Sequence, residues 1–193
     1  MDMLNRKFIL ASGSPRRREL LGMLGVDFTV DTSRQVDERI PDGVYIEAEK
    51  IPEYLSQVKA EAYLSDLTDD NVLVTADTVV ILDGDVIGKP VDEGDARRML
   101  RRLSGRVHKV VTGVTVVSSG KRKTFSETTE VEFAPISDDE IDYYVDTFHP
   151  VDKAGAYGIQ EWIGAVAVKG LRGSYYNVMG LPVNRLYREL KDW

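Results

Sequence analysis

Residues 72–82, VLVTADTVVIL, predict the central strand of a sheet, because β-branched and aliphatic side chains make up most of the run. The dipeptide Asp83-Gly84 follows and suits a tight hairpin turn. Inside the run stands one carboxylate, Asp77, at a position where burial is costly unless the group is protonated or bound to a cation. Asp77 is therefore a candidate catalytic or metal-binding group, and the alternative is a structurally paired Asp at a strand end or bulge. Thr78 beside it is an ordinary strand former.

A strand, a turn and a helix precede this stretch. Residues 7–11, KFILA, are a short apolar run, and leucines recur at helical spacing in RRRELLGMLGV at residues 16–26. Ser14 suits the N-cap of that helix, and Pro15 suits its first position, where a missing N–H has no partner to lose. We expect Gly25 to end the helix.

Ser12, Ser14, Arg16 and Arg17 lie where this helix begins, and together they suit phosphate. A helix N-terminus offers unpaired N–H groups and a positive dipole end, while arginine binds phosphate oxygens in bidentate fashion. A capped surface helix with solvated arginines is the alternative interpretation. The patterns GxxxxGK[ST] and GxGxxG are absent from the sequence, which excludes a P-loop or a Rossmann site.

The remaining pattern mixes helices and hairpins. Residues 31–52 form a polar loop, broken by proline and glycine, that could act as a lid. We expect helices over 52–65, 93–105, 137–148 and from Pro182 onward, and strands over 107–119, 124–136 and 163–170. Hairpins among alternating strands and helices predict a mixed α/β sheet rather than a wholly parallel one.

Composition narrows the class of protein. The 193 residues, 42% hydrophobic and 30% charged, predict a single domain over residues 1–193. A net charge of −7 argues against nucleic-acid polymers as partners. The absence of cysteine and the wide spacing of His108 and His149 exclude disulfides and suggest no transition-metal site. Neither a signal-peptide core nor a membrane-length apolar stretch is apparent, so we expect a cytoplasmic protein without a membrane partner.

Three further charged residues are candidates for a phosphate or metal site. Lys59 lies on the helix predicted over 52–65 and Lys89 lies in the turn-like GKP stretch, and either could reach a phosphate, although a lone lysine is more often solvated surface. Glu38, in the polar loop, could join Asp77 around a hard cation, since Mg²⁺ prefers carboxylates together with substrate phosphates.

Eight ordered motifs carry a resemblance to a known family. They are ASGSPRRRELL at 11–21, VDE at 36–38, KA at 59–60, ADTVV at 76–80, GKP at 88–90, LSGRVHKVVTGV at 103–114, DKAGAYGIQ at 152–160 and NVMGLPV at 177–183. In this combination the chain resembles the Maf family of nucleoside triphosphate pyrophosphatases, nearly from end to end.

The resemblance implies an elongated two-lobed α/β fold with a central cleft, similar to inosine triphosphate pyrophosphatases, and a homodimer. It also implies hydrolysis between the α- and β-phosphates of a nucleoside triphosphate with Mg²⁺ or Mn²⁺. Asp77 would be the proton acceptor and a metal ligand, with Glu38 helping at the metal. The groups implied to bind substrate phosphates are Ser12, Ser14, Arg16, Arg17, Lys59 and Lys89.

The form of residues 152–160 resembles the subgroup that acts on dTTP and UTP. Gln160 can donate to a pyrimidine O4 and accept from N3–H, which matches thymine and uracil but not cytosine. Arg17 and Thr78 match the other positions associated with specificity in that subgroup. One departure is the pair Glu161-Trp162, where the family usually has a glycine and then a less bulky residue.

The main hypothesis is hydrolysis of dTTP and UTP, which includes house-cleaning of modified pyrimidine nucleotides. Two other functions compete with it. One is a nucleotide-binding regulator of septum formation with little turnover, for which the carboxylate of Asp77 would be unnecessary. The other is a purine-type pyrophosphatase for inosine or methylated guanine nucleotides, against which Gln160 argues.

Overall fold

The computed structural model describes residues 6–68, 70–191 and 193, which form two compact units. Among these described residues, unit 1 takes those within 6–77, 112–127 and 180–193, and unit 2 takes 78–111 and 128–179. The chain changes unit inside three strands and again after residue 179. Whether both units make one functional domain, as the sequence analysis expects, stays a prediction.

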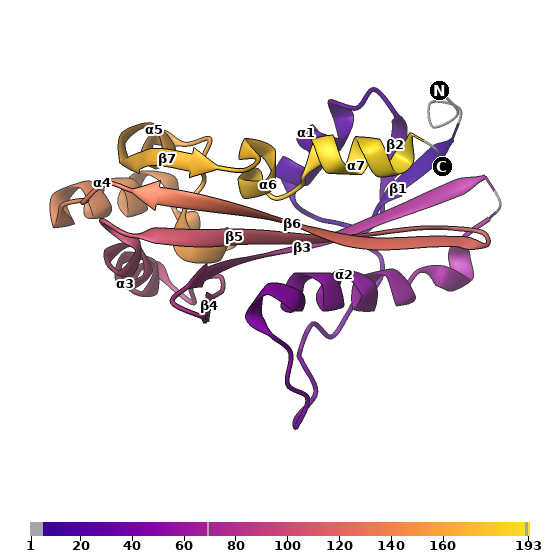
Figure 1. Cartoon of the computed structure of the whole chain (residues 1–193), viewed down its shortest axis with the longest axis horizontal. Helices are drawn as coiled ribbons and strands as arrows, with labels where there is room; N and C mark the ends of the chain where they lie inside the picture. The colour runs from indigo at the N-terminus through magenta and orange to yellow at the C-terminus, as the bar shows by residue number, and fades with distance from the viewer. Residues whose placement is uncertain (1–5, 69, 192) are drawn as a thin grey trace. The chain divides into compact units, whose positions relative to one another are not determined.

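The strands form one mixed sheet of seven strands in the order β2-β1-β3-β5-β6-β7, with β4 paired to β3 (Figure 1). Their bounds are β1 Lys7–Leu10, β2 Asp27–Val30, β3 Asn71–Leu82, β4 Asp85–Ile87, β5 Val107–Ser118, β6 Lys121–Phe133 and β7 Val168–Arg172. Strand β1 is parallel to β2 and β3, whereas β4 and β7 run antiparallel to β3 and β6. The predicted class, a mixed α/β sheet flanked by helices, is confirmed.

Seven α-helices accompany the sheet in the described residues. They are α1 Pro15–Gly22, α2 Ile51–Glu61, α3 Glu93–Leu103, α4 Asp138–Phe148, α5 Trp162–Ala167, α6 Tyr175–Met179 and α7 Val183–Leu190. Within unit 1, α2 covers one face of the strands, and α1 and α7 cover the other (Figure 1). Across residues 6–68, 70–191 and 193, no helix has both the length and the apolar composition needed to cross a membrane.

The core of unit 1 lies on both faces of its strands. Its fully buried side chains include Phe8, Leu10, Leu20, Leu21, Leu73 and Leu186. Helix α2 comes unusually close to β5, because a Cβ atom at Gly113 would lie 2.2 Å from the carbonyl carbon of Pro52. Only glycine fits at this contact, so the start of α2 is seated directly on the backbone of β5.

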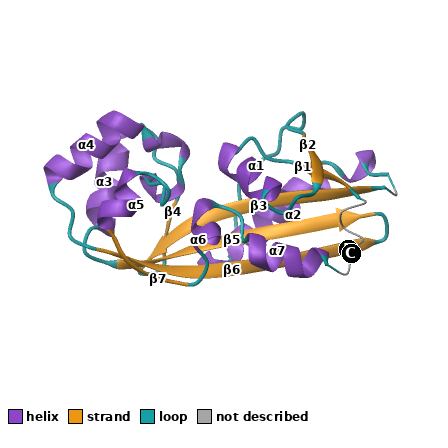
Figure 2. Cartoon of the chain, turned by 90° about the horizontal axis from the view of Figure 1, so that it is seen from above, coloured by secondary structure: helices purple, strands orange, loops and turns teal. Residues whose placement is uncertain are grey.

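Unit 2 groups α3, α4 and α5 beside its strands (Figure 2). Leu100, Leu103, Phe133, Ile141 and Tyr144 are fully buried there. Acidic side chains of α4 pair with arginines of α3, as in the contact between Arg97 Nε and Asp142 Oδ1 at 2.7 Å. These ion pairs lie at the surface, so apolar packing contributes most of the stability of the helix pair.

A buried histidine lies in the core of unit 2. The rings of His108, Phe133 and Tyr157 pack edge to face, and His108 Nε2 lies 2.7 Å from the Tyr157 hydroxyl. Burial lowers the pKa of His108 to about 4. The imidazole is therefore neutral near pH 7 and packs as part of the core.

Several local predictions are confirmed. Ser14 caps α1 by accepting from the Arg17 N–H, and Pro15 begins the helix, which ends at Gly22, before the predicted Gly25. The β3–β4 turn has positive φ at both Asp83 and Gly84, as expected for a tight hairpin. Helix α4 matches the helix predicted over 137–148, and Ser137 and Glu140 form a capping box at its start.

The predicted strand over residues 163–170 is wrong for residues 163–167, which belong to helix α5. Residues 168–170 do lie in a strand, β7. A short apolar run fits a buried helix as well as a strand, and Gly164 settles the choice by contact. A Cβ at Gly164 would lie 1.7 Å from the Ile159 carbonyl oxygen, so the helix packs directly on the preceding turn. Strand β2 was not predicted, because its four residues are mostly exposed and form no apolar run.

Candidate active site

The turn between β1 and α1 is built by its two serines. Ser12 Oγ accepts from the Ser14 N–H at 3.3 Å, and Ser14 Oγ accepts from the Arg17 N–H at 3.4 Å. The hydroxyls thereby hold the turn against the first turn of α1, where helix N–H groups and the positive end of the helix dipole converge. The arrangement supplies the polar groups that a phosphate requires.

Arg17 ties this turn to two distant parts of unit 1. Its Nη1 donates to the Ala76 carbonyl oxygen at 2.8 Å, and its Nε donates to the Gly180 carbonyl oxygen at 2.9 Å. Loss of solvent around the guanidinium lowers the pKa of Arg17, while Asp77 and Glu38 act in the opposite direction. Arg17 remains a cation, since arginine stays protonated in proteins, and its charge acts directly on Asp77.

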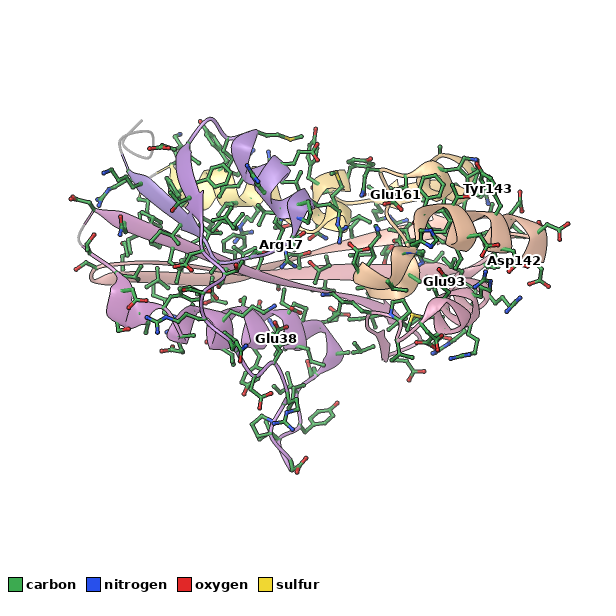
Figure 3. The ribbon with its side chains drawn as sticks, turned by 180° about the vertical axis from the view of Figure 1, so that it is seen from behind. Arg17, Glu38, Glu93, Asp142, Tyr143 and Glu161 are labelled. Carbon is green, nitrogen blue, oxygen red and sulfur yellow. The ribbon has the colours of Figure 1, made fainter. Side chains whose placement is uncertain are left out.

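Asp77 is the last residue of unit 1 along β3 and belongs to an ion-paired cluster. Its side chain is 13% exposed, and Oδ1 lies 2.7 Å from Lys59 Nζ. The same ammonium lies 3.0 Å from Oε2 of Glu38, whose side chain is 52% exposed. Figure 3 shows Glu38 beside α2, where the loop before that helix passes. One ammonium thus brings a buried and an exposed carboxylate together.

Lys59 is positioned by hydroxyl contacts beneath α2. Ser56, one helical turn before Lys59, shares a hydrogen bond of 2.8 Å with Thr115 of β5. Thr75 of β3 donates to the Ser56 carbonyl oxygen at 2.6 Å. These groups are fully buried, so their directional bonds set the position of α2 along the strands.

The donor set of Asp77 and Glu38 suits a divalent cation. Both are carboxylates, the ligands that Mg²⁺ and Mn²⁺ favour, and Lys59 Nζ already marks a point where a positive charge contacts both. In the described part of the chain, no group of three or more His, Cys, Asp or Glu side chains could hold a metal. The two carboxylates by themselves fit a cation that takes its other ligands from substrate phosphates and water, as Mg²⁺ commonly does.

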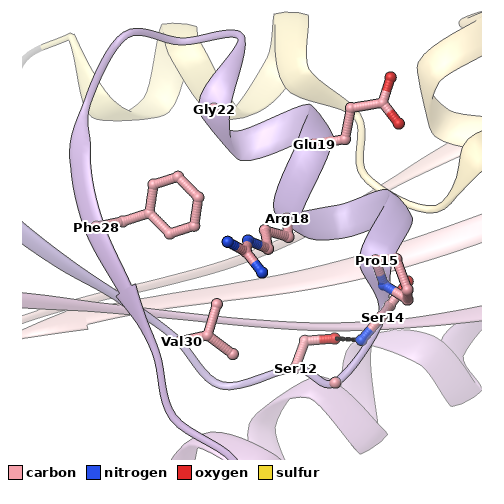
Figure 4. Close-up of a pocket in the computed structure, with 9 residues that line it drawn as sticks. Ser12, Ser14, Pro15, Arg18, Glu19, Gly22, Phe28 and Val30 are labelled. Atoms are coloured by element: carbon pink, nitrogen blue, oxygen red, sulfur yellow. Dashed lines mark hydrogen bonds between the residues drawn. The ribbon is translucent and has the colours of Figure 1, made fainter.

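A pocket of about 430 Å³ opens beside the same turn in unit 1 (Figure 4). Its polar side is formed by Ser12, Ser14 and Arg18, and its apolar side includes Phe28 and Val30 of β2. The sequence analysis missed these two apolar residues because it missed β2. The pocket places apolar surface next to the serines of the turn.

Unit 2 carries the other predicted residues. Lys89 and Gln160 are exposed, and Thr78 is half-buried on β3. The Gly155 N–H donates to the Gly88 carbonyl oxygen at 2.9 Å, so the loop of Lys89 is bound to the segment that leads to Gln160. Within the described residues, the Gln160 amide has no hydrogen-bond partner in the protein, which leaves it available to a ligand.

The predicted residues thus fall into two sets. Unit 1 brings together Ser12, Ser14, Arg16, Arg17, Glu38, Lys59 and Asp77, and unit 2 carries Thr78, Lys89 and Gln160. Sequence analysis missed the Ala76 and Gly180 carbonyls that hold Arg17. Backbone acceptors leave no signal in a sequence, although NVMGLPV at residues 177–183 marks the segment to which Gly180 belongs.

Comparison with protein families identifies the chain. The family model described as Maf-like protein matches residues 7–193. The chain belongs to the Maf family. The resemblance inferred from the sequence motifs is therefore confirmed.

Curated Maf relatives are similar over nearly the whole chain. A dTTP/UTP pyrophosphatase of Phocaeicola vulgatus is 55% identical over 96% of this chain and 95% of the relative. The Porphyromonas gingivalis protein of the same name is 52% identical over 100% of this chain and 98% of its own. These names agree with the enzyme class predicted from the sequence, a nucleoside triphosphate pyrophosphatase.

A solved structure confirms the fold. A HAM1 protein from Coxiella burnetii superposes with a TM-score of 0.51, covering 97% of this Maf chain and 100% of its own, at 15% identity. The fold is therefore shared with that protein, as the expected similarity to inosine triphosphate pyrophosphatases implies.

Proposed function

We propose that this Maf protein hydrolyses dTTP and UTP to the nucleoside monophosphate and pyrophosphate, with Asp77 as the proton acceptor. The observation that carries the proposal is the shielded Asp77 carboxylate, ion-paired to Lys59 at 2.7 Å next to the turn between β1 and α1. The curated relatives named dTTP/UTP pyrophosphatase support the choice of substrate.

The reaction requires water to attack the α-phosphorus while the bond to the bridging oxygen breaks. Asp77 would orient that water and accept its proton, a role that a carboxylate held in place by the Lys59 ammonium can fill. Pyrophosphate leaves with the electron pair of the broken bond. Charge spreading onto the leaving group must then be stabilised by positive groups.

The positive groups for this task come from both sets of predicted residues. In unit 1, Arg16 and Arg17 stand at the N-terminus of α1, with Ser12 and Ser14 adding hydroxyls. Lys59 and Lys89 would supply ammonium groups to the phosphates. Arginine can bind two oxygens at once, whereas lysine acts as a point charge, so Arg16 would orient the phosphates and the lysines neutralise them. Arg17, whose guanidinium donates to the Ala76 and Gly180 carbonyls, would contribute mainly its charge.

Asp77 and Glu38 would hold a divalent metal, Mg²⁺ or Mn²⁺, which supplies charge neutralisation and polarises the phosphate oxygens when bound. Lys59 must then share or yield its contacts with the two carboxylates. It would remain close enough to contact a phosphate oxygen, because its ammonium stands on a flexible four-carbon stem.

Recognition of the base is assigned to Gln160, with Arg17 and Thr78 as the other specificity positions. The exposed Gln160 amide presents one donor and one acceptor, the pattern that O4 and N3–H of thymine and uracil require. Cytosine offers the reverse pattern and would leave both groups unpaired in this orientation of the amide.

The test is pyrophosphate release from dTTP, UTP, CTP, dCTP, GTP, ITP and 7-methyl-GTP, with Mg²⁺, with Mn²⁺ and with a chelator. We expect turnover only with metal, and mainly on dTTP and UTP. Asp77→Asn should still bind the nucleotide, as measured by calorimetry, while its kcat should fall at least about a hundredfold. Asp27→Asn, which changes an exposed carboxylate on β2, serves as the matched control.

Two outcomes would redirect the assignment. Binding without turnover in the wild-type protein would favour the nucleotide-binding regulator of septum formation. A preference for ITP or 7-methyl-GTP would favour the purine-type enzyme and overturn the role given to Gln160.

A further inference from the structure

Glu161, the residue after Gln160, has an unusually well-connected carboxylate. It is 19% exposed as a side chain and contacts two groups from other parts of unit 2. Oε1 lies 3.1 Å from Lys153 Nζ, and Oε2 accepts a hydrogen bond from the Tyr144 hydroxyl. The two partners come from different segments, Lys153 from the loop before the turn and Tyr144 from α4.

Lys153 explains the first contact. Its side chain is 9% exposed, and a shielded ammonium needs a counter-ion close by. Asp152 lies 2.7 Å from it but is 54% exposed, whereas Glu161 approaches from the shielded side. Glu161 is therefore the less exposed of the two carboxylates that pair with the Lys153 ammonium.

Tyr144 explains the second contact. Its ring is fully buried on α4, and its hydroxyl oxygen also accepts from the Gly158 N–H at 3.0 Å. Burial and the hydrogen bond to Glu161 raise the pKa of Tyr144, so the phenol remains a donor throughout the neutral range. One hydroxyl thus connects the backbone of residue 158 with the carboxylate of residue 161.

The turn itself is closed and tightly packed. The Glu161 N–H donates to the Gly158 carbonyl oxygen at 3.0 Å, so residues 158–161 form a turn with Gln160 as its third residue. A Cβ at Gly158 would lie 2.8 Å from Glu161 Cδ and 3.0 Å from Gln160 Nε2. The Glu161 carboxyl group therefore folds back over Gly158, next to the Gln160 amide.

The Gln160 side chain, unlike that of Glu161, makes no contact of this kind with the described residues. Its amide is exposed and has no partner among the described residues, so the direction in which it points depends on the backbone of the turn. That backbone is held at residue 158 by Tyr144 and at residue 161 by Tyr144 and Lys153. Figure 3 marks Glu161 in this unit, together with Tyr143, the neighbour of Tyr144 on α4.

We propose that Glu161 is a positioning residue for base selection: through Tyr144 and Lys153 it fixes the turn that presents Gln160 to the pyrimidine. The proposal rests on the role of Gln160 under the proposed function. Glu161 does not touch the base in this scheme. It limits the orientations of Gln160, and a recognition group with fewer orientations discriminates better between a matched and a mismatched base.

The experiment compares kcat/KM for dTTP and dCTP in Glu161→Gln and Tyr144→Phe, with folding checked by thermal unfolding. Glu161→Gln keeps the shape but removes the charge, and Tyr144→Phe keeps the buried ring but removes the hydroxyl. We expect each to lower the dTTP/dCTP ratio about tenfold, mainly through KM for dTTP, with a smaller change in kcat. Tyr143→Phe is the control, since that side chain is 51% exposed and should leave the ratio unchanged.

A double-mutant cycle separates this inference from the proposed function. If Gln160→Ala leaves the ratio unchanged, the assigned role of Gln160 is wrong, whatever Glu161 does. If Gln160→Ala lowers the ratio and the folded variants at 161 and 144 do not, the positioning role is wrong. A positioning role further requires that Glu161→Gln has no additional effect on the ratio in the Gln160→Ala background, and an additive effect there would overturn it.

Discussion

The ammonium group of Lys59 lies 2.7 Å from the carboxylate of Asp77. Lys59 stands on α2, which packs closely on β5 because residue 113 is a glycine. The same ammonium contacts Glu38 at 3.0 Å, so it occupies the point where both carboxylates proposed for the metal converge. Under the proposed function, lysine and metal would therefore compete for the same two groups, and this competition can be measured.

Replacing Lys59 by methionine should strengthen metal binding and weaken catalysis. Loss of the positive charge leaves two carboxylates with more negative potential, so the Kd for Mn²⁺ in the absence of nucleotide should fall about tenfold. The kcat/KM for dTTP should fall at the same time, because a phosphate contact is lost. Calorimetric titration with Mn²⁺ gives the first quantity, and pyrophosphate release gives the second.

Lys50→Met is the matched control for this variant. Lys50 precedes α2, pairs with Glu53 at 3.3 Å and is 59% exposed. Its loss should leave the Mn²⁺ affinity unchanged. An equal affinity in wild type and Lys59→Met would contradict the competition between lysine and metal.

Arg17→Lys should damage the site although it keeps the charge. A lysine ammonium cannot reach both the Ala76 and Gly180 carbonyls as the guanidinium fork does. At least one shielded carbonyl then loses its donor, at a cost of about 1–3 kcal/mol in stability. We expect a lower midpoint in urea unfolding and a fall of at least tenfold in kcat/KM for dTTP. Arg185→Lys, on the exposed face of α7, should change neither measurement.

Because His108 is buried, we expect the free energy of unfolding of the protein to fall in mild acid. The pKa of its imidazole is about 4 in the folded protein and about 6.5 when unfolded, so the unfolded chain binds the proton first. Its contribution is fully present above about pH 6.5 and is lost as the pH falls toward 4. Between pH 7 and pH 5 the loss amounts to about 2 kcal/mol.

Urea unfolding of the wild-type protein and His108→Gln at several pH values measures this effect. The variant should be less stable at pH 7, but its stability should depend less on pH between 7 and 5. His149→Gln provides the comparison, because His149 is 65% exposed and pairs with Glu93 at the surface. Parallel pH curves for wild type and His108→Gln would rule out the buried histidine as the source.

Gly113→Ala should be among the most destabilising single-methyl additions in unit 1. The added carbon would lie 2.2 Å from the Pro52 carbonyl carbon and 2.3 Å from the Glu53 nitrogen, and backbone atoms cannot yield as a flexible side chain would. We expect a loss of about 3 kcal/mol or more, measured by urea unfolding.

Gly22→Ala tests whether the effect is specific to the contact. An added carbon at Gly22, the last residue of α1, would meet only Phe28 at 3.8 Å, which is an ordinary contact. Its stability should change by less than about 1 kcal/mol, in the direction of greater stability. A similar loss in both glycine variants would show that the close approach of α2 to β5 is not the cause.

The sequence predicts those parts of the fold in which a local pattern has one physical solution. The buried run of β3, the cap at Ser14 and the helix that begins after Ser137 are of this kind. The segment over 163–167 was assigned wrongly because a six-residue apolar run satisfies both helix and strand, and only the contact of Gly164 with the preceding turn selects the helix.

The candidate site was predictable by residue type but not by contact. Asp77 stands out as a carboxylate in an apolar run, and Lys59 and Glu38 follow from motif resemblance. Their common ion pair depends on a loop that has no periodic pattern. The contact of Glu161 with Tyr144 joins residues 17 positions apart, with a turn and two short 3₁₀ segments between them. Nothing in either local sequence indicates the partner.

The buried hydroxyls of Ser56, Thr75 and Thr115 have a consequence for protein engineering. Replacing the serine by alanine and the two threonines by valine is an obvious route to greater heat tolerance, because each change replaces a polar core atom by an apolar one. It would also remove the directional bonds that stop α2 from sliding along the strands. Lys59 would move with the helix, so tolerance gained in this way would be traded against turnover. A thermostable version of this enzyme is better sought at its surface, with these three hydroxyls left in place.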